Sequence, residues 1–123
     1  MWVKMDDKLP SNPKVDRLSD GAFRLYVSSL CHCGAYLTDG WIEKKTVARL
    51  IPRFKKSYVD ELLTKRPEEQ FSLWEDHGER YFVHDFTKIN KTRQHWKERR
   101  ETENERLKNW RQSKGGRTHL EAL

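Results

Sequence analysis

The side chains with the clearest chemical potential in this 123-residue sequence are cations that gather in two places. Residues 43–66 contain eight basic and three acidic residues, and residues 87–117 contain eleven and four, although residues 1–86 as a whole carry no net charge. Dense Lys and Arg side chains neutralise phosphates, so the two clusters predict a surface that binds a polyanion, most simply a nucleic acid. The alternative is that each run only keeps a solvated helix soluble.

The residues expected to contact the polyanion divide in the same way. In the first cluster two hydroxyl side chains join the cations, because both can donate to phosphates or base edges. That set is Lys44, Lys45, Arg53, Lys55, Lys56, Ser57, Thr64 and Lys65. The second set is Lys91, Arg93, Lys97, Arg99, Arg100, Arg106, Lys108 and Arg111.

Other kinds of chemistry find little support in the sequence. It has no Ser-His-Asp arrangement, Gly-rich phosphate loop, HExxH motif or carboxylate set spaced for a metal, so we expect neither catalysis nor a cofactor. Cys31 and Cys33 are too close to close a useful loop, and we expect two buried, reduced thiols rather than a zinc site. No signal peptide or 18-residue apolar run occurs, which favours a soluble protein inside the cell.

Several elements must position the first cluster. Residues 2–5 predict an extended arm followed by a loop to residue 18. Ser19 is a typical N-cap for a helix over about 20–37, whose apolar residues recur every three or four positions. Asp39-Gly40 predicts a turn into the short strand Trp41-Ile42, and helical spacing then resumes up to Pro52.

A second short helix is predicted to end near Pro67, with Ser57 and Asp60 as a capping box and Val59, Leu62 and Leu63 on its buried face. Residues 71–74 and 80–86 then predict a β-hairpin with Gly78 in the turn and with an edge free to pair with residues 41–42. This order predicts an α+β fold, a winged helix-turn-helix of three helices and a small hairpin sheet. We expect it to cover residues 1–90, followed by a long basic helix over 91–112 and a flexible tail over 113–123.

The helix after Pro52 is the natural candidate to enter a major groove, with cations at its start for the phosphates. Asp60 and Glu61 oppose this placement, although Asp60 has a capping role available. The hairpin tip is acidic, which indicates a structural hairpin. Trp96, Leu107 and Trp110 on the last helix favour a packing contact, either with the domain or with a second copy of the chain.

Four stretches carry a family resemblance: residues 2–6 (WVKMD), 12–15 (NPKV), 18–26 (LSDGAFRLY) and 37–42 (LTDGWI). Over about residues 1–90 the chain resembles the N-terminal winged-helix domain of phage replisome-organiser (DnaD-like) proteins and related actinobacteriophage helix-turn-helix proteins. The resemblance implies a module that binds double-stranded DNA in the cytoplasm of a bacterial host. It also implies replication or transcription proteins as partners.

Residues 91–123 do not resemble the large second domain of the longer replisome organisers, so we also expect that a small phage regulator of transcription or recombination competes with a role in replication initiation. A protein-docking or homodimerisation module, using the winged helix and the Trp-bearing last helix, is the alternative from another functional class.

Overall fold

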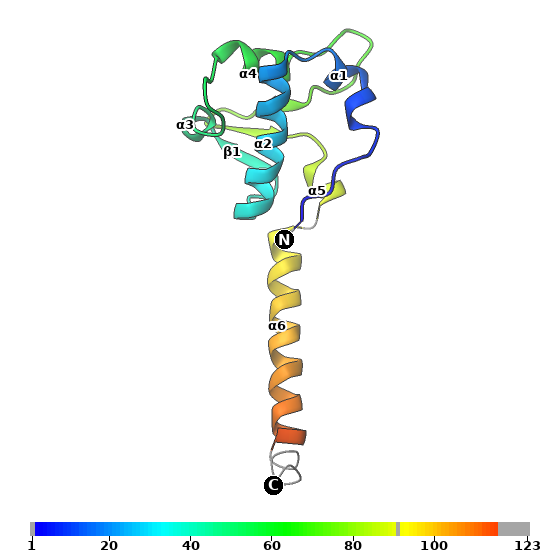
Figure 1. Cartoon of the computed structure of the whole chain (residues 1–123), viewed down its shortest axis with the longest axis vertical. Coiled ribbons are helices and arrows are strands. Elements are labelled where there is room, and N and C mark those ends of the chain that lie inside the picture. The colour runs from blue at the N-terminus through cyan, green and yellow to red at the C-terminus, as the bar shows by residue number, and fades with distance from the viewer. Residues whose placement is uncertain (1, 91, 116–123) are drawn as a thin grey trace. The chain divides into compact units, whose positions relative to one another are not determined.

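The computed structural model describes residues 2–90 and 92–115, with side chains up to residue 113. The chain divides into two compact units, residues 1–91 and 92–123 (Figure 1). The predicted contact residue Lys91 and most of the predicted tail, residues 116–123, lie outside the described residues. Residues 113–115 form part of a π-helix that spans Arg111–Gly115, so the described start of the predicted tail is helical.

Helix α2, Asp20–Tyr36, is the centre of the first unit and confirms the most regular pattern of the sequence. The Ser19 hydroxyl accepts a hydrogen bond from the Ala22 N–H, as the N-cap prediction requires. Leu25 is fully buried on the core face of the helix. The helix ends at Leu37, which adopts the left-handed conformation with φ of 52°.

The segment before α2 is more structured than the predicted arm and loop. It contains a 3-10 helix, Leu9–Ser11, and the short helix α1, Pro13–Asp16, which is capped by Asn12. Residues 2–5 form no strand. Instead, a Cβ added to Gly34 would lie 2.2 Å from a methyl carbon of Val3, and the Lys4 N–H donates to Oδ1 of Asn90 at 2.7 Å. The arm is therefore held against α2 and the end of the first unit.

The predicted three-stranded sheet is present and antiparallel, with the order β1-β3-β2. Strand β1, Trp41–Glu43, pairs with β3, Arg80–Val83, so that Trp41 faces Phe82. Strand β2, Trp74–Asp76, pairs with the other edge of β3. Gly40 and Gly78 both have positive φ, as their turns demand. The three-residue strand β1 thus gains its stability from the hairpin.

The boundaries of the hairpin and its continuation differ from the prediction. Residues 71–73 precede β2 instead of forming it, and β3 ends at Val83 rather than at Phe86. Asp85 has a φ of 60°, which breaks the extended backbone and lets the chain enter α5, Phe86–Ile89. The side chain of Phe86 is buried in the core.

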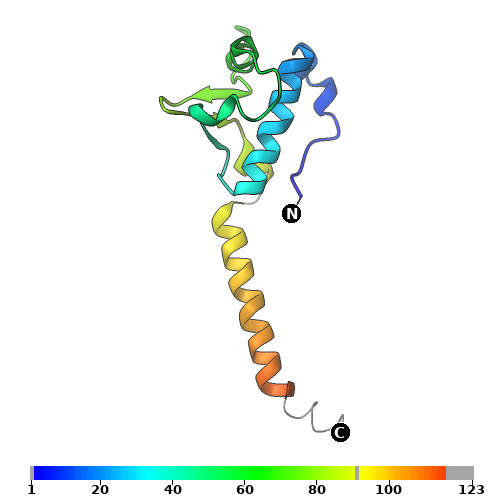
Figure 2. The same cartoon turned by 60° about the vertical axis from the view of Figure 1, so that its left-hand side comes forward.

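Two further helices, α3 and α4, complete the first unit. Helix α3 is only Lys44–Val47, shorter than the spacing up to Pro52 suggested, and α4 is Lys56–Leu63. Figure 2 shows α4 near the N-terminal end of α2. The Tyr58 ring of α4 fills the space beside Gly21 of α2. Val59 and Leu62 are buried in the core, which confirms the predicted inner face of α4.

The second unit contains α6, Arg93–Trp110, whose N-cap Thr92 accepts from the His95 N–H. This helix confirms the predicted long C-terminal helix, and none of its side chains is buried. Among the described residues, no helix is both long and apolar enough to cross a membrane.

Candidate nucleic-acid interface

Three of the predicted contact residues meet at the start of α4. Arg53, Lys55 and Lys56 are all exposed, and within residues 2–90 and 92–113 none of their side chains has an ion-pair or hydrogen-bond partner. Lys55 is the N-cap of α4 but makes no side-chain capping bond, so its ammonium group is free to bind elsewhere. Three cations within four residues of chain form a compact positive surface, which we call the α4 cationic cluster.

The outward face of α4 beyond this cluster is acidic. Ser57, Asp60, Glu61 and Thr64 line a shallow hollow of about 270 Å³ together with residues 17 and 18. The Thr64 hydroxyl donates to the Asp60 carbonyl oxygen at 2.6 Å, and is therefore already engaged by its own helix. The middle of α4 presents two carboxylates, whereas its beginning presents only cations.

The predicted capping box at Ser57 and Asp60 is wrong. Helix α4 begins two residues earlier than a Ser57 cap would place it, at Lys56 with Lys55 as its N-cap. Ser57 therefore lies inside the first turn, and Asp60 has no orphan N–H to accept from. Glu61 instead caps another helix: its carboxylate accepts from the Ser19 N–H at 2.8 Å and from the Ser19 hydroxyl at 2.6 Å. These bonds hold the Glu61 carboxylate toward the start of α2.

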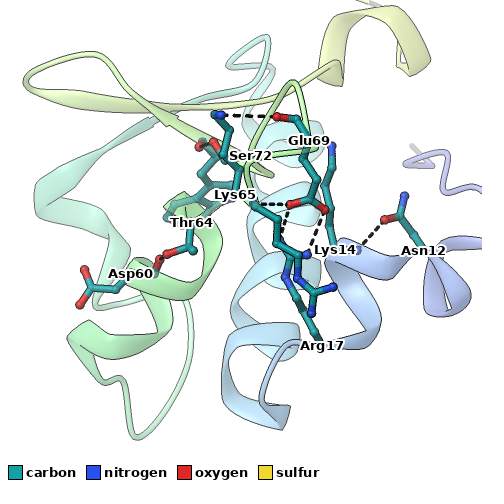
Figure 3. A network of polar contacts seen from close by, with 10 residues as sticks. Asn12, Lys14, Arg17, Asp60, Thr64, Lys65, Glu69 and Ser72 are labelled. Atoms are coloured by element: carbon teal, nitrogen blue, oxygen red, sulfur yellow. Dashed lines mark hydrogen bonds and ion pairs between the residues drawn. The ribbon is translucent and has the colours of Figure 1, made fainter.

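A second carboxylate, Glu69, organises the segment after α4 (Figure 3). Arg17 makes a bidentate pair with it, with N–O distances of 2.6 and 2.9 Å, and the Arg66 N–H donates to it at 2.7 Å. These bonds lower the pKa of the Glu69 carboxyl to about 2. The Lys65 ammonium donates to the Glu69 carbonyl oxygen at 3.4 Å, so this predicted contact residue is partly engaged within the domain.

The first lysine of α3 is engaged by the hairpin. Nζ of Lys44 lies 2.9 Å from Oδ1 of Asp76, and this hydrogen bond raises the pKa of Lys44 and lowers that of Asp76. The Arg80 guanidinium lies 3.9 Å from the centre of the Trp41 ring. The negative charge of the hairpin tip is thus partly neutralised by Lys44. Because Asp76 compensates the charge of Lys44, this lysine is less available to a ligand than the sequence predicted.

Two neighbouring cations remain available. Lys45 and Arg49 are exposed and have no side-chain partner in the part of the chain that the structure describes. Arg49 belongs to the basic run 43–66 but is not among the predicted contacts. It lies beside a wide surface hollow between α2 and α3, together with Tyr36 and Leu50.

The cations of α6 fall on more than one face. At 100° per residue, the steps of three and four positions place one set on a continuous stripe, which we call the α6 basic stripe. It consists of Arg93, Lys97, Arg100 and Lys108 of α6 together with Arg111, the residue directly after the helix, all of them exposed. Arg99 and Arg106 lie on another side of the helix, and Nε of Arg99 is 3.8 Å from Glu103. The predicted set of α6 contacts is therefore divided.

The two cysteines differ from each other. Cys33 is buried, and burial raises the pKa of its thiol to about 11, whereas Cys31 is exposed. The expectation of two buried thiols is therefore wrong for Cys31. Across the described residues, no group of three or more His, Cys, Asp or Glu side chains is placed to hold a metal ion.

Comparison with known proteins found no matching family model, no matching curated protein and no matching solved structure.

Proposed function

We propose that this chain is a non-enzymatic protein that binds double-stranded DNA through a winged helix-turn-helix and a basic C-terminal helix. The order α2, β1, α3, α4, β2, β3 supports this fold assignment. In a winged helix, a short strand follows the first helix and pairs with a hairpin at the end of the domain, and two helices lie between the strand and the hairpin in the sequence. The eight-residue connection between α3 and α4, residues 48–55, serves as a long turn of the helix-turn-helix.

The observation that carries the proposal is the α4 cationic cluster. DNA-reading helices contact base edges with their first residues while flanking cations bind phosphates. Arg53, Lys55 and Lys56 supply such cations at the beginning of α4, and Ser57 supplies a hydroxyl donor in its first turn. Because the exposed Asp60 would face the phosphates unfavourably, α4 enters the groove by its N-terminal turn rather than lying along it.

The α6 basic stripe supplies the second part of the interface. Four of its five cations lie along α6, an 18-residue helix that is about 27 Å long at 1.5 Å per residue, and Arg111 follows directly. A rod of this kind binds the phosphate backbone without reading sequence, and each phosphate it neutralises steepens the salt dependence of binding. The hairpin has a structural role, since its acidic tip is held by Lys44.

The biological setting follows from the resemblance of residues 1–90 to phage replisome organisers. We propose a phage or prophage protein that acts in the bacterial cytoplasm, in replication initiation or as a transcription regulator. Sequencing the DNA fragments bound by the protein in host cells tests this setting. Fragments concentrated at one locus support an origin or an operator, and an even spread would contradict both roles.

A protein-docking role is the second candidate, and two observations favour it. The middle of α4 presents the exposed Asp60, and α6 exposes Leu107 and Trp110. A titration of labelled duplex DNA at low salt separates the candidates, because a docking module would leave the duplex unbound.

A further inference from the structure

One stripe of α6 repeats with the seven-residue period of a coiled coil. Its positions are Trp96, Arg100, Glu103, Leu107 and Trp110, separated by alternating steps of four and three residues. Leu107 is 45% exposed and Trp110 is 52% exposed, so two large apolar side chains of this stripe lie in solvent. Trp96 is partly covered within its own helix, by the edge-on ring of His95 and by the Arg99 guanidinium.

The arrangement of this stripe is apolar at both ends and charged in the middle. If two copies of α6 packed in parallel, every position would face itself, and Arg100 would face Arg100 while Glu103 faced Glu103. If they packed antiparallel, with the centre between residues 101 and 102, Trp96 would face Leu107 and Arg100 would face Glu103. Only the antiparallel arrangement pairs opposite charges and still buries apolar residues against each other.

We propose that α6 pairs antiparallel with α6 of a second copy of this chain, in the register that sets Trp96 against Leu107 and Arg100 against Glu103. In this register Trp110 lies opposite Arg93, whose aliphatic stem and guanidinium group suit the face of an indole. The two central Arg–Glu layers fix orientation and register, as buried polar residues do in coiled coils.

The pairing is weak on its own, and it places Arg93 and Arg100 of the α6 basic stripe in the seam. Of the five positions with the seven-residue period, only Trp96, Leu107 and Trp110 are apolar, and the helix is short for a coiled coil. The flanking Arg99 and Arg106 also face each other across the seam, which opposes association. Lys108 points away from the seam, so a dimer still presents cations to DNA, now with twofold symmetry.

Sedimentation of the full chain over a range of concentrations tests the proposal without DNA. The wild type should show a reversible monomer–dimer equilibrium. Arg100→Glu and Glu103→Arg should each weaken the dimer by about tenfold or more, because each creates two like-charge layers, and the double swap should restore it to within about threefold. Lys108→Glu makes the same charge change as Arg100→Glu outside the seam, and should leave the equilibrium unchanged.

Cross-linking tests the orientation. In a Cys31→Ser background, Lys97→Cys and Asn104→Cys chains are mixed and oxidised, and the antiparallel register should give mainly the mixed 97–104 product. Circular dichroism of each variant checks that α6 is still helical.

Three results would overturn the proposal. The chain could remain a monomer at all concentrations, the dimerisation equilibrium could be unchanged by both Arg100→Glu and Glu103→Arg, or the cross-links could form mainly between identical positions.

Discussion

The α4 cationic cluster gives the sharpest prediction, through the double substitution Lys55→Ala with Lys56→Ala. Both side chains are exposed, and neither has a partner among the described residues, so their removal should leave the fold intact. Lys55 makes no side-chain cap, which removes the usual reason for a substitution at an N-cap to destabilise a helix. We therefore expect unchanged thermal unfolding and weakened binding to duplex DNA.

The size of the effect follows from counterion release. Each phosphate contact contributes about 0.9 to the slope of log affinity against log salt concentration, so losing two contacts should flatten the slope by about 1.8. Over a fourfold rise in salt, the wild type should then lose about 12-fold more affinity than the double variant. Lys44→Ala is the matched control for a single lysine, because Asp76 already holds that ammonium group, and it should change the slope by much less than Lys55→Ala.

Fluorescence anisotropy of a labelled duplex at four or more salt concentrations measures these slopes. If the double variant keeps the wild-type slope, the α4 cationic cluster does not contact phosphate. An equal loss for Lys44→Ala and Lys55→Ala would show that the ion pair with Asp76 does not decide which cations bind.

Three further predictions concern the scaffold and the last helix. Gly21→Ala should destabilise the fold by about 1 kcal/mol in chemical denaturation, because a Cβ would lie 2.1 Å from the Tyr58 ring and overpacking outweighs the gain in helix propensity. On a Tyr58→Ala background the ring is absent, and Gly21→Ala should instead stabilise the fold. Glu69 has a pKa of about 2 in the fold against an ordinary 4.5, so its pairing with Arg17 stabilises the fold fully above about pH 4.5, and this stabilisation is lost as the pH falls toward 2. In Glu69→Gln, the free energy of unfolding should therefore depend less on pH across that window. An unchanged pH profile would exclude this pair as its cause. Truncation after Asn90 should leave a folded domain by circular dichroism with lower affinity for duplex DNA, whereas loss of the fold would make α6 structural.

Local signals were enough to predict the elements that depend on neighbouring residues. Helix α2 follows from an N-cap at Ser19 and a regular apolar stripe, and the hairpin follows from β-branched and aromatic runs around Gly78. The stub strand at Trp41 was also predictable, because two extended residues after a turn need a partner and the hairpin offers an edge.

The remaining details depend on contacts distant in sequence. Ser57 and Asp60 fit a capping box by spacing, but α4 begins at Lys56 and has no side-chain cap at its N-terminus. Nothing local indicates that Glu61 binds Ser19, 42 residues away.

The candidate site divides for the same reason. Lys44, Lys65 and Lys55 are alike in sequence, yet Asp76 engages the first, the Glu69 carbonyl oxygen engages the second, and the third has no partner in the described chain. Charge runs therefore predict where cations gather, whereas the fold decides which of them remain available.

The most direct measurement is the affinity of the full chain for a labelled duplex at about 50 and 200 mM salt. DNA binding through the α4 cationic cluster and the α6 basic stripe predicts a measurable complex at the lower concentration and a steep loss at the higher one. No complex at the lower concentration, or an affinity indifferent to salt, would contradict it.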